Sequence, residues 1–420
     1  MRRADRRRSI RAWAMYDWAN SAFATAVMAG FFPIHFKQYW AAGMAASEST
    51  FWLGLANGAA GLMVAVMAPV LGAVADRCGA KKRLLMAFAG LGVVMTGGLF
   101  FAREGAWVAA MLLYALAAIG FSAGNVFYDA LLTDVAAPGE LDRVSALGYG
   151  LGYLGGGLLF ALDVAAVTHP HWFGLAGTDA AVRAAFLSVA LWWAAFSLPL
   201  IWRVRESAPA ISLPILEAAR AGLAELADTF HHVRRFRAVW LFLVAYWLYI
   251  DGVGTIARMA LDYGLALGID ARALIRALLL TQFVAFPAAI VFGRVGERYG
   301  PKAGILVGIC VYAGLCVWSL FMKDARDFWW LAGVSGLVMG GVQSLSRSLY
   351  ARLIPRDKAG EFFGFYNMMG KFAAILGPVL MAVVSLASGS NRLAVLSVAV
   401  LFLAGGAVLW RVQVRSAAGG

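Results

Sequence analysis

The stretch GAVADRCGAK, residues 72–81, returns as GRVGERYGPK at residues 293–302. Both copies read glycine, three residues, an acid, arginine, one residue, glycine, one residue and lysine, and both join two apolar blocks. A second match supports a repeat, because Asp129 and Arg347 stand near the ends of equivalent blocks in the two halves of the chain. Parallel repeats of this kind are an architecture of membrane transporters.

The composition around these loops requires a bilayer. Apolar residues make up 62% of the 420 residues and charged residues 14%, whereas a soluble domain carries roughly 25% charged residues. A membrane span needs about 20 mainly apolar residues. The sequence therefore predicts an all-α membrane protein of twelve transmembrane helices in two six-helix bundles, at approximately 12–36, 51–75, 84–102, 106–134, 144–167, 183–202, 238–262, 273–293, 303–321, 328–352, 361–387 and 392–411.

The basic residues predict how the chain is oriented. The net charge is +13, and Lys and Arg gather in alternate loops and at the arginine-rich start, which the positive-inside rule places in the cytoplasm. We expect the protein in a bacterial inner membrane, with both termini on the cytoplasmic side. The predicted organisation is an N-terminal bundle over 1–202, a cytoplasmic linker over 203–237 and a C-terminal bundle over 238–420. In the linker, apolar residues at helical spacing after Ser212 predict an amphipathic surface helix.

The sequence gives little support to several other classes of function. The arginine-rich start lacks the aromatic or glycine-rich context of a nucleic-acid site. Three cysteines without a CxxC pair and scattered histidines indicate no metal site. Tyr16-Asp17 and Tyr128-Asp129 resemble one half of an intramembrane aspartyl protease site, but the Gly-x-Gly-Asp half is absent, as are a Walker A loop and an HExxH motif. We expect no enzyme activity, no cofactor and no metal.

The 72–81 loop resembles the signature between helices two and three of the major facilitator superfamily. Gly72 permits close approach of a neighbouring helix, and Gly79 permits a tight turn. Asp76 can cap a helix N-terminus or pair with an arginine, and such a contact can break when the two halves rock. The alternative is a basic loop that only sets topology. The candidate gating residues of both copies are Gly72, Asp76, Arg77, Gly79, Lys81, Glu297 and Arg298.

A narrower resemblance covers nearly the whole chain. YDWANSAF at 16–23, NVFYDA at 125–130, QSLSRSL at 343–349 and EFFGFYN at 361–367 are together similar to the vacuole-effluxer-like branch of the same superfamily. The resemblance implies secondary active transport of amino acids or related small polar solutes by alternating access, with proton coupling left open. A transporter-like sensor, a lipid or drug translocator and, less well supported, an intramembrane enzyme are the alternatives.

Polar side chains inside a membrane are costly and commonly mark a pathway. In the superfamily, helices one, four, seven and ten line the central cavity, and each of these spans carries an ionisable residue here. We predict that Asp129 and Arg347 interact, although each could serve as a structural ion pair. The partners expected are a small-molecule solute and the lipid bilayer, with the chain acting as a monomer. The candidate pathway residues are Asp17, Asn20, Asn125, Asp129, Asp251, Gln343, Arg347, Asn367 and Lys371.

Overall fold

A computed structural model describes residues 3–207, 217, 236–266, 270–373 and 375–414. The secondary structure of these residues is helical throughout. Eleven helices among them are long and apolar enough to cross a membrane. The first predicted span is not one of the eleven, because α1 (Arg3–Ala22) begins with a run of arginines. The chain continues from α1 through η1 (Phe23–Phe31), α2 (Phe32–His35) and η2 (Phe36–Trp40), and these elements supply the twelfth span.

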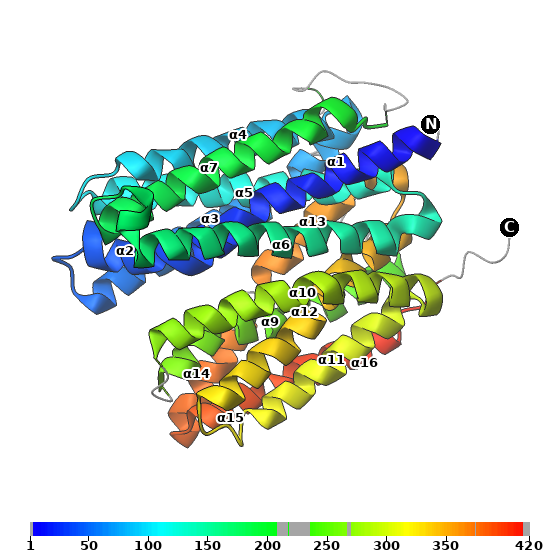
Figure 1. Cartoon of the computed structure of the whole chain (residues 1–420). Helices are drawn as coiled ribbons and strands as arrows, with labels where there is room; N and C mark the ends of the chain where they lie inside the picture. The colour runs from blue at the N-terminus through cyan, green and yellow to red at the C-terminus, as the bar shows by residue number, and fades with distance from the viewer. Residues whose placement is uncertain (1–2, 208–216, 218–235, 267–269, 374, 415–420) are drawn as a thin grey trace, which may run out of the picture.

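The helices form two groups that lie side by side (Figure 1). The first group adds five long helices and three short 3-10 turns to the first span: α3 (Ala46–Cys78), α4 (Lys81–Gly98), η3 (Leu99–Phe101), α5 (Trp107–Val135), η4 (Pro138–Glu140), α6 (Leu141–Thr168), η5 (Pro170–Phe173) and α7 (Thr178–Arg203). The second group contains α9 (Arg237–Ala266), α10 (Ala271–Tyr299), α11 (Pro301–Trp318), α12 (Ala325–Leu353), η6 (Arg356–Lys358), α13 (Ala359–Phe372), α14 (Leu376–Ser388), α15 (Asn391–Ser397) and α16 (Ala399–Trp410).

Two predicted spans are interrupted. The span expected over 361–387 is two helices, α13 and α14, and the span expected over 392–411 is α15 followed by α16. Pro378 has no backbone N–H, so it fits the first turn of α14 but would interrupt a helix that continued from α13. Nothing in the sequence marks the change from α15 to α16 as clearly.

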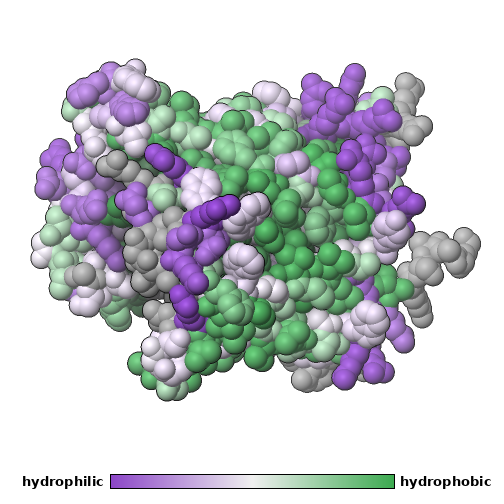
Figure 2. Space-filling view, turned by 60° about the horizontal axis from the view of Figure 1, so that its bottom comes forward, coloured by the Kyte–Doolittle hydropathy of each residue, from purple (hydrophilic) through white to green (hydrophobic). Residues whose placement is uncertain are grey.

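The outer surface matches a lipid environment. Figure 2 shows an apolar band over the middle of the molecule and hydrophilic side chains at the two ends. Large apolar side chains are exposed along the spans, for example Leu62, Val94, Leu112, Leu191 and Leu403. A bilayer solvates such side chains, and water would not.

The first repeat copy has the turn predicted at Gly79, and the second copy turns in a similar way at Gly300. Gly79 ends α3 with φ 59°, and Gly300 precedes α11 with φ 85°. Glycine reaches this left-handed region without steric cost. The amphipathic helix predicted inside 203–237 lies outside the described residues. Where the chain enters that segment, burial raises the pKa of the Glu206 carboxyl, which accepts a hydrogen bond from the backbone N of Lys82 at 3.1 Å.

Candidate functional site: a polar cavity between the two halves

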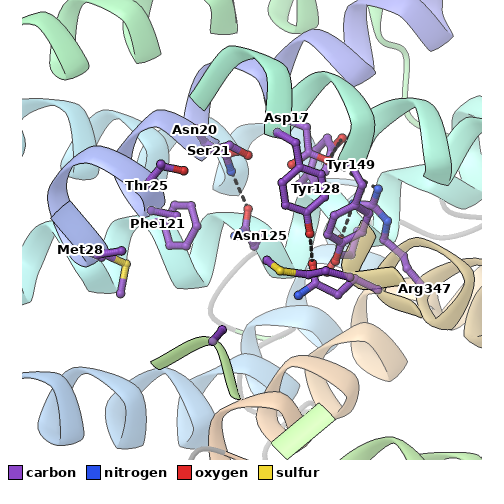
Figure 3. Close-up of a pocket in the computed structure, with 18 of the residues that line it drawn as sticks. Asp17, Asn20, Ser21, Thr25, Met28, Phe121, Asn125, Tyr128, Tyr149 and Arg347 are labelled. Atoms are coloured by element: carbon purple, nitrogen blue, oxygen red, sulfur yellow. Dashed lines mark hydrogen bonds and ion pairs between the residues drawn. The ribbon is translucent and has the colours of Figure 1, made fainter. Parts of the chain in front are cut away.

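A cavity of about 600 Å³ lies between the two groups of helices. Its walls come from α1, η1, α5 and α6 on one side and from α9, α10, α12 and α13 on the other. Ten of the lining residues are labelled in Figure 3. Most of the predicted pathway residues line this cavity: Asp17, Asn20, Asn125, Asp129, Gln343, Arg347 and Asn367.

Arg347 is the centre of a buried charge cluster that joins the halves. Its side chain from α12 is almost completely buried, and its Nη1 donates to Asp129 Oδ1 of α5 at 3.0 Å. Its Nη2 lies 3.5 Å from Asp17 Oδ2 of α1. Its Nε donates to Ser145 Oγ of α6, and Nη2 to the Ser145 carbonyl oxygen, each at 2.9 Å. The predicted Asp129–Arg347 contact is therefore confirmed, and Asp17 joins it.

Aromatic rings surround the same guanidinium. The Cζ of Arg347 lies 4.2 Å from the ring centroid of Tyr149, 5.0 Å from Trp13 and 5.2 Å from Tyr128. The Tyr128 hydroxyl donates to Asp17 Oδ2 at 3.0 Å. Cation–π contacts strengthen when they are shielded from water. The cluster is thus held by rings as well as by opposite charges.

Hydrogen bonds that involve amides and hydroxyls line the rest of the cavity. Asn20 Nδ2 donates to Asn125 Oδ1 at 2.7 Å within the first half (Figure 3). Tyr153 donates to Gln343 Oε1 at 2.6 Å and so joins α6 to α12. Across the cavity, Gln282 Nε2 donates to Thr25 Oγ1 at 2.7 Å, and Asn367 Nδ2 donates to Asp129 Oδ2 at 3.1 Å. The wall can therefore meet a polar solute with amides and hydroxyls.

Two predicted pathway residues lie elsewhere. Asp251 is fully buried and does not line the cavity. Its Oδ2 accepts from the backbone N of Gly377 at 3.0 Å, in the first turn of α14, and Thr255 donates to its Oδ1 at 3.3 Å. In this conformation Asp251 caps α14, a new helix whose N-terminal N–H groups need an acceptor. A part for Asp251 in the pathway stays a prediction. Lys371 also lies outside the lining and donates to Ser122 Oγ at 2.7 Å.

The cap geometry predicts that Asp251 contributes to stability more than to solute binding. Asp251→Ala is expected to cost about 1–3 kcal/mol, because it leaves the buried N–H of Gly377 in α14 without its acceptor. Asp251→Asn keeps an acceptor oxygen and should cost less. Thermal unfolding of the purified protein, with and without transported solute, measures both effects. A variant that unfolds normally but no longer binds solute would return Asp251 to the pathway.

The first copy of the repeated loop clamps the two halves together at one end of the molecule. Asp76 accepts from the backbone N of Gly360 at 3.0 Å and of Glu361 at 2.9 Å, in the first turn of α13. A carboxylate there also complements the positive end of the helix dipole. Asp76 pairs with Lys81 at 3.3 Å, and Lys81 pairs with Asp134 at 3.3 Å. The capping role expected of Asp76 is confirmed, with lysine as its partner in place of arginine.

The glycines of this copy have the predicted geometry. A Cβ at Gly72 would overlap the carbonyl of Gly360, and a Cβ at Gly360 would lie 2.6 Å from the Gly72 carbonyl oxygen. The α3 and α13 backbones therefore touch at a point where only glycine fits. Arg77 is half-buried beside them.

The second copy has no equivalent clamp through its acid. Glu297 and Arg298 are exposed, and within the described ranges Glu297 forms no ion pair. The contact at this place comes from Asp142, at the start of α6, which accepts from Arg352 Nη2 of α12 at 2.5 Å. The expected gating role of Glu297 and Arg298 thus has no contact to support it here. The two copies differ because the buried acid lies on α6, not on the repeated loop.

Sequence reasoning missed Asp142, Ser145, Tyr149 and the pairing role of Arg352. Asp142 and Ser145 lie one helical turn apart at the start of α6, and Tyr149 follows one turn later. This spacing could have predicted that the three side chains share one face of α6, because positions i, i+3 and i+4 are neighbours on a helix surface.

Two bundles that enclose a polar cavity and are joined by polar contacts at one end define a membrane transporter of the major facilitator type. The solved structure of the human organic anion transporter MFSD10 is similar to this chain with a TM-score of 0.75 and 16% identity, covering 96% of this chain and 99% of that one. That likeness supports the fold.

The sequence comparisons define the family. The model of the family "Vacuole effluxer Atg22 like" matches residues 5–419, and the chain belongs to this family. It is 40% identical to the uncharacterized MFS-type transporter YxiO of Bacillus subtilis, over 94% of this chain and 93% of that protein. It is 26% identical to autophagy-related protein 22 of Eremothecium gossypii, over 80% of this chain and 71% of that protein.

Proposed function

We propose that this transporter moves amino acids or related small polar solutes by alternating access, with proton coupling. The observation that carries the proposal is the buried cluster of Asp17, Asp129 and Arg347 at a cavity between the halves. Such charges are expensive inside a membrane unless they are paired or functional. The description of the family as vacuole effluxer-like supports solute export as the direction.

The alternating-access part of the proposal rests on contacts that switching can break. The Asp76 cap on α13 and the Asp142–Arg352 pair both join helices of different halves at the same end of the molecule. Water can replace each of these hydrogen bonds when that end opens. The halves 1–202 and 238–420 would then rock as units, with 203–237 as their connection. Each chain encloses its own cavity, so a monomer suffices.

A proteoliposome uptake screen tests the proposal. Purified protein is assayed with a panel of amino acids and short peptides, with and without a pH gradient, against protein-free liposomes. Uptake of at least one solute that the gradient accelerates is the expected result. Flux that a pH gradient leaves unchanged would remove the proton-coupling part, and no flux of any solute would contradict the transporter assignment for amino acids.

The proposed orientation makes a separate prediction. Ser47, at the start of α3, should face outward, and Ser207, after α7, should face the cytoplasm, because the positive-inside rule puts the arginine-rich loops inside. Both residues are exposed. Single cysteines at the two positions, in a background without Cys78, Cys310 and Cys316, are treated in intact cells with a membrane-impermeant thiol reagent. Labelling at Ser47→Cys and not at Ser207→Cys is expected, and the reverse pattern would invert the topology.

A further inference from the structure

Among the residues that the structure describes, the charged groups at the cavity do not balance. Two carboxylates, Asp17 and Asp129, line it together with one guanidinium, Arg347. Lys371, the other nearby cation, lies outside the lining. With all three groups ionised, the described part of the lining carries one excess negative charge. A site in the membrane with such an excess favours a cation as its occupant.

The hydrogen bonds show which charged atoms remain open to a solute. Four of the five N–H groups of Arg347 are directed at Asp129, Asp17 and both oxygens of Ser145. A guanidinium has five such groups in all. A carboxylate from a solute would therefore have to displace existing partners of Arg347. The guanidinium serves mainly as the counter-charge of the protein's own carboxylates.

The carboxylate of Asp17, unlike the guanidinium of Arg347, keeps an oxygen that is open to a solute. Its Oδ2 accepts from Tyr128 and faces Arg347 Nη2, whereas no donor in the described part of the chain bonds to its Oδ1. One turn along α1, Asn20 is 1% exposed and its Oδ1 also lacks a hydrogen-bond partner among the described residues. Buried acceptors are rarely left unsatisfied without a reason. Both residues line the cavity, so a donor-rich group can reach them there.

We propose that Asp17 and Asn20 bind the protonated amine of the transported solute, and that Arg347 does not bind a solute carboxylate. An ammonium group carries one positive charge and up to three N–H donors, which matches an open carboxylate oxygen beside an open amide oxygen. Aromatic and thioether side chains farther along the wall, such as Phe121 and Met28, suit an apolar substituent on that amine. This inference rests on the proposed function and names the chemical class of the solute.

The test uses three solutes of matched shape: phenylalanine, phenethylamine, which lacks the carboxylate, and N-acetylphenylalanine, which lacks the cationic amine. Binding to the purified wild-type protein is measured by calorimetry and by the shift in thermal unfolding. Phenethylamine should bind within about tenfold of phenylalanine, whereas N-acetylphenylalanine should bind at least about tenfold more weakly than either, because it loses the charge-assisted hydrogen bonds. The comparison within the wild type does not depend on whether any variant folds.

Asp17→Asn supplies the second arm, with Asp163→Asn as its matched control. Asp163 is also a buried carboxylate of the first half, but it accepts from Ser188 at 2.9 Å and does not line the cavity. Asp17→Asn should weaken binding of phenethylamine at least about tenfold, and Asp163→Asn should leave it unchanged. Equal binding of the acetylated solute, or no binding of either amine, would overturn the inference. Uptake of any other solute in the proteoliposome screen would still leave the proposed transport function standing.

Discussion

Replacing Arg347 with glutamine should abolish transport and strongly destabilise the protein. The change removes the guanidinium that faces both Asp17 and Asp129, at 3.5 and 3.0 Å. Removing one member of a buried ion pair typically costs about 3–5 kcal/mol, because the remaining charge is left uncompensated. Here two carboxylates lose their counter-charge together. Thermal unfolding of the purified variant and flux in proteoliposomes measure the two losses.

Removing the carboxylates as well should restore the fold and leave transport lost. Asp129→Asn should damage transport by itself. In thermal unfolding, Asp129→Asn with Arg347→Gln should destabilise the protein less than the two single losses added, which is the sign of coupling in a double-mutant cycle. A triple variant that also carries Asp17→Asn has no buried charge in the cluster, so its stability should approach that of the wild type. Losses that simply add would mean that the three side chains act separately.

Replacing Gly72 with alanine should prevent the clamp from closing. The new Cβ would overlap the backbone carbonyl of Gly360, which cannot move without displacing α13. Overpacking of this kind costs about 1–3 kcal/mol, which shifts the conformational equilibrium by about 5- to 150-fold. Transport should fall by a similar factor, with normal insertion in the membrane.

The reactivity of a cysteine placed at the start of α13 measures directly whether the Gly72–Gly360 contact is closed. Ala359 is fully buried at the start of α13, so a cysteine there should react slowly in the wild type and faster beside Gly72→Ala. The matched controls are Gly58→Ala and Gly61→Ala on the same helix, where an added Cβ meets no atom within 4 Å. If Gly72→Ala labels and transports like these controls, the Gly72–Gly360 contact has no part in gating.

Much of the architecture could be predicted from local sequence. Apolar blocks of membrane-spanning length predict the spans, because the bilayer imposes both the length and the composition of a helix. The periodic spacing of Asp17 and Asn20, and of Asn125 and Asp129, placed each pair on one face of its helix. The repeat then placed Arg347 opposite Asp129, and their contact is present at 3.0 Å.

Asp251 shows why such reasoning is incomplete. A polar residue in the middle of span seven is equally compatible with a cavity and with a helix cap, and the sequence of that span alone does not separate them. Only the break between α13 and α14 provides the free N–H of Gly377 that Asp251 accepts from. The break belongs to a segment more than a hundred residues away in the chain, so its effect on Asp251 is a property of tertiary packing.

The sequence by itself determined what the bilayer and the backbone dictate locally: the spans, their repeat, the glycine turns at Gly79 and Gly300, and the helix faces that carry polar side chains. The tertiary structure decided which of those side chains meet. Arg347 reaches Asp17 across 330 positions of sequence, and Arg352 reaches Asp142 across 210. Contacts at such separations depend on how two bundles dock, and a buried charge is stabilised only by partners that docking brings within hydrogen-bond distance.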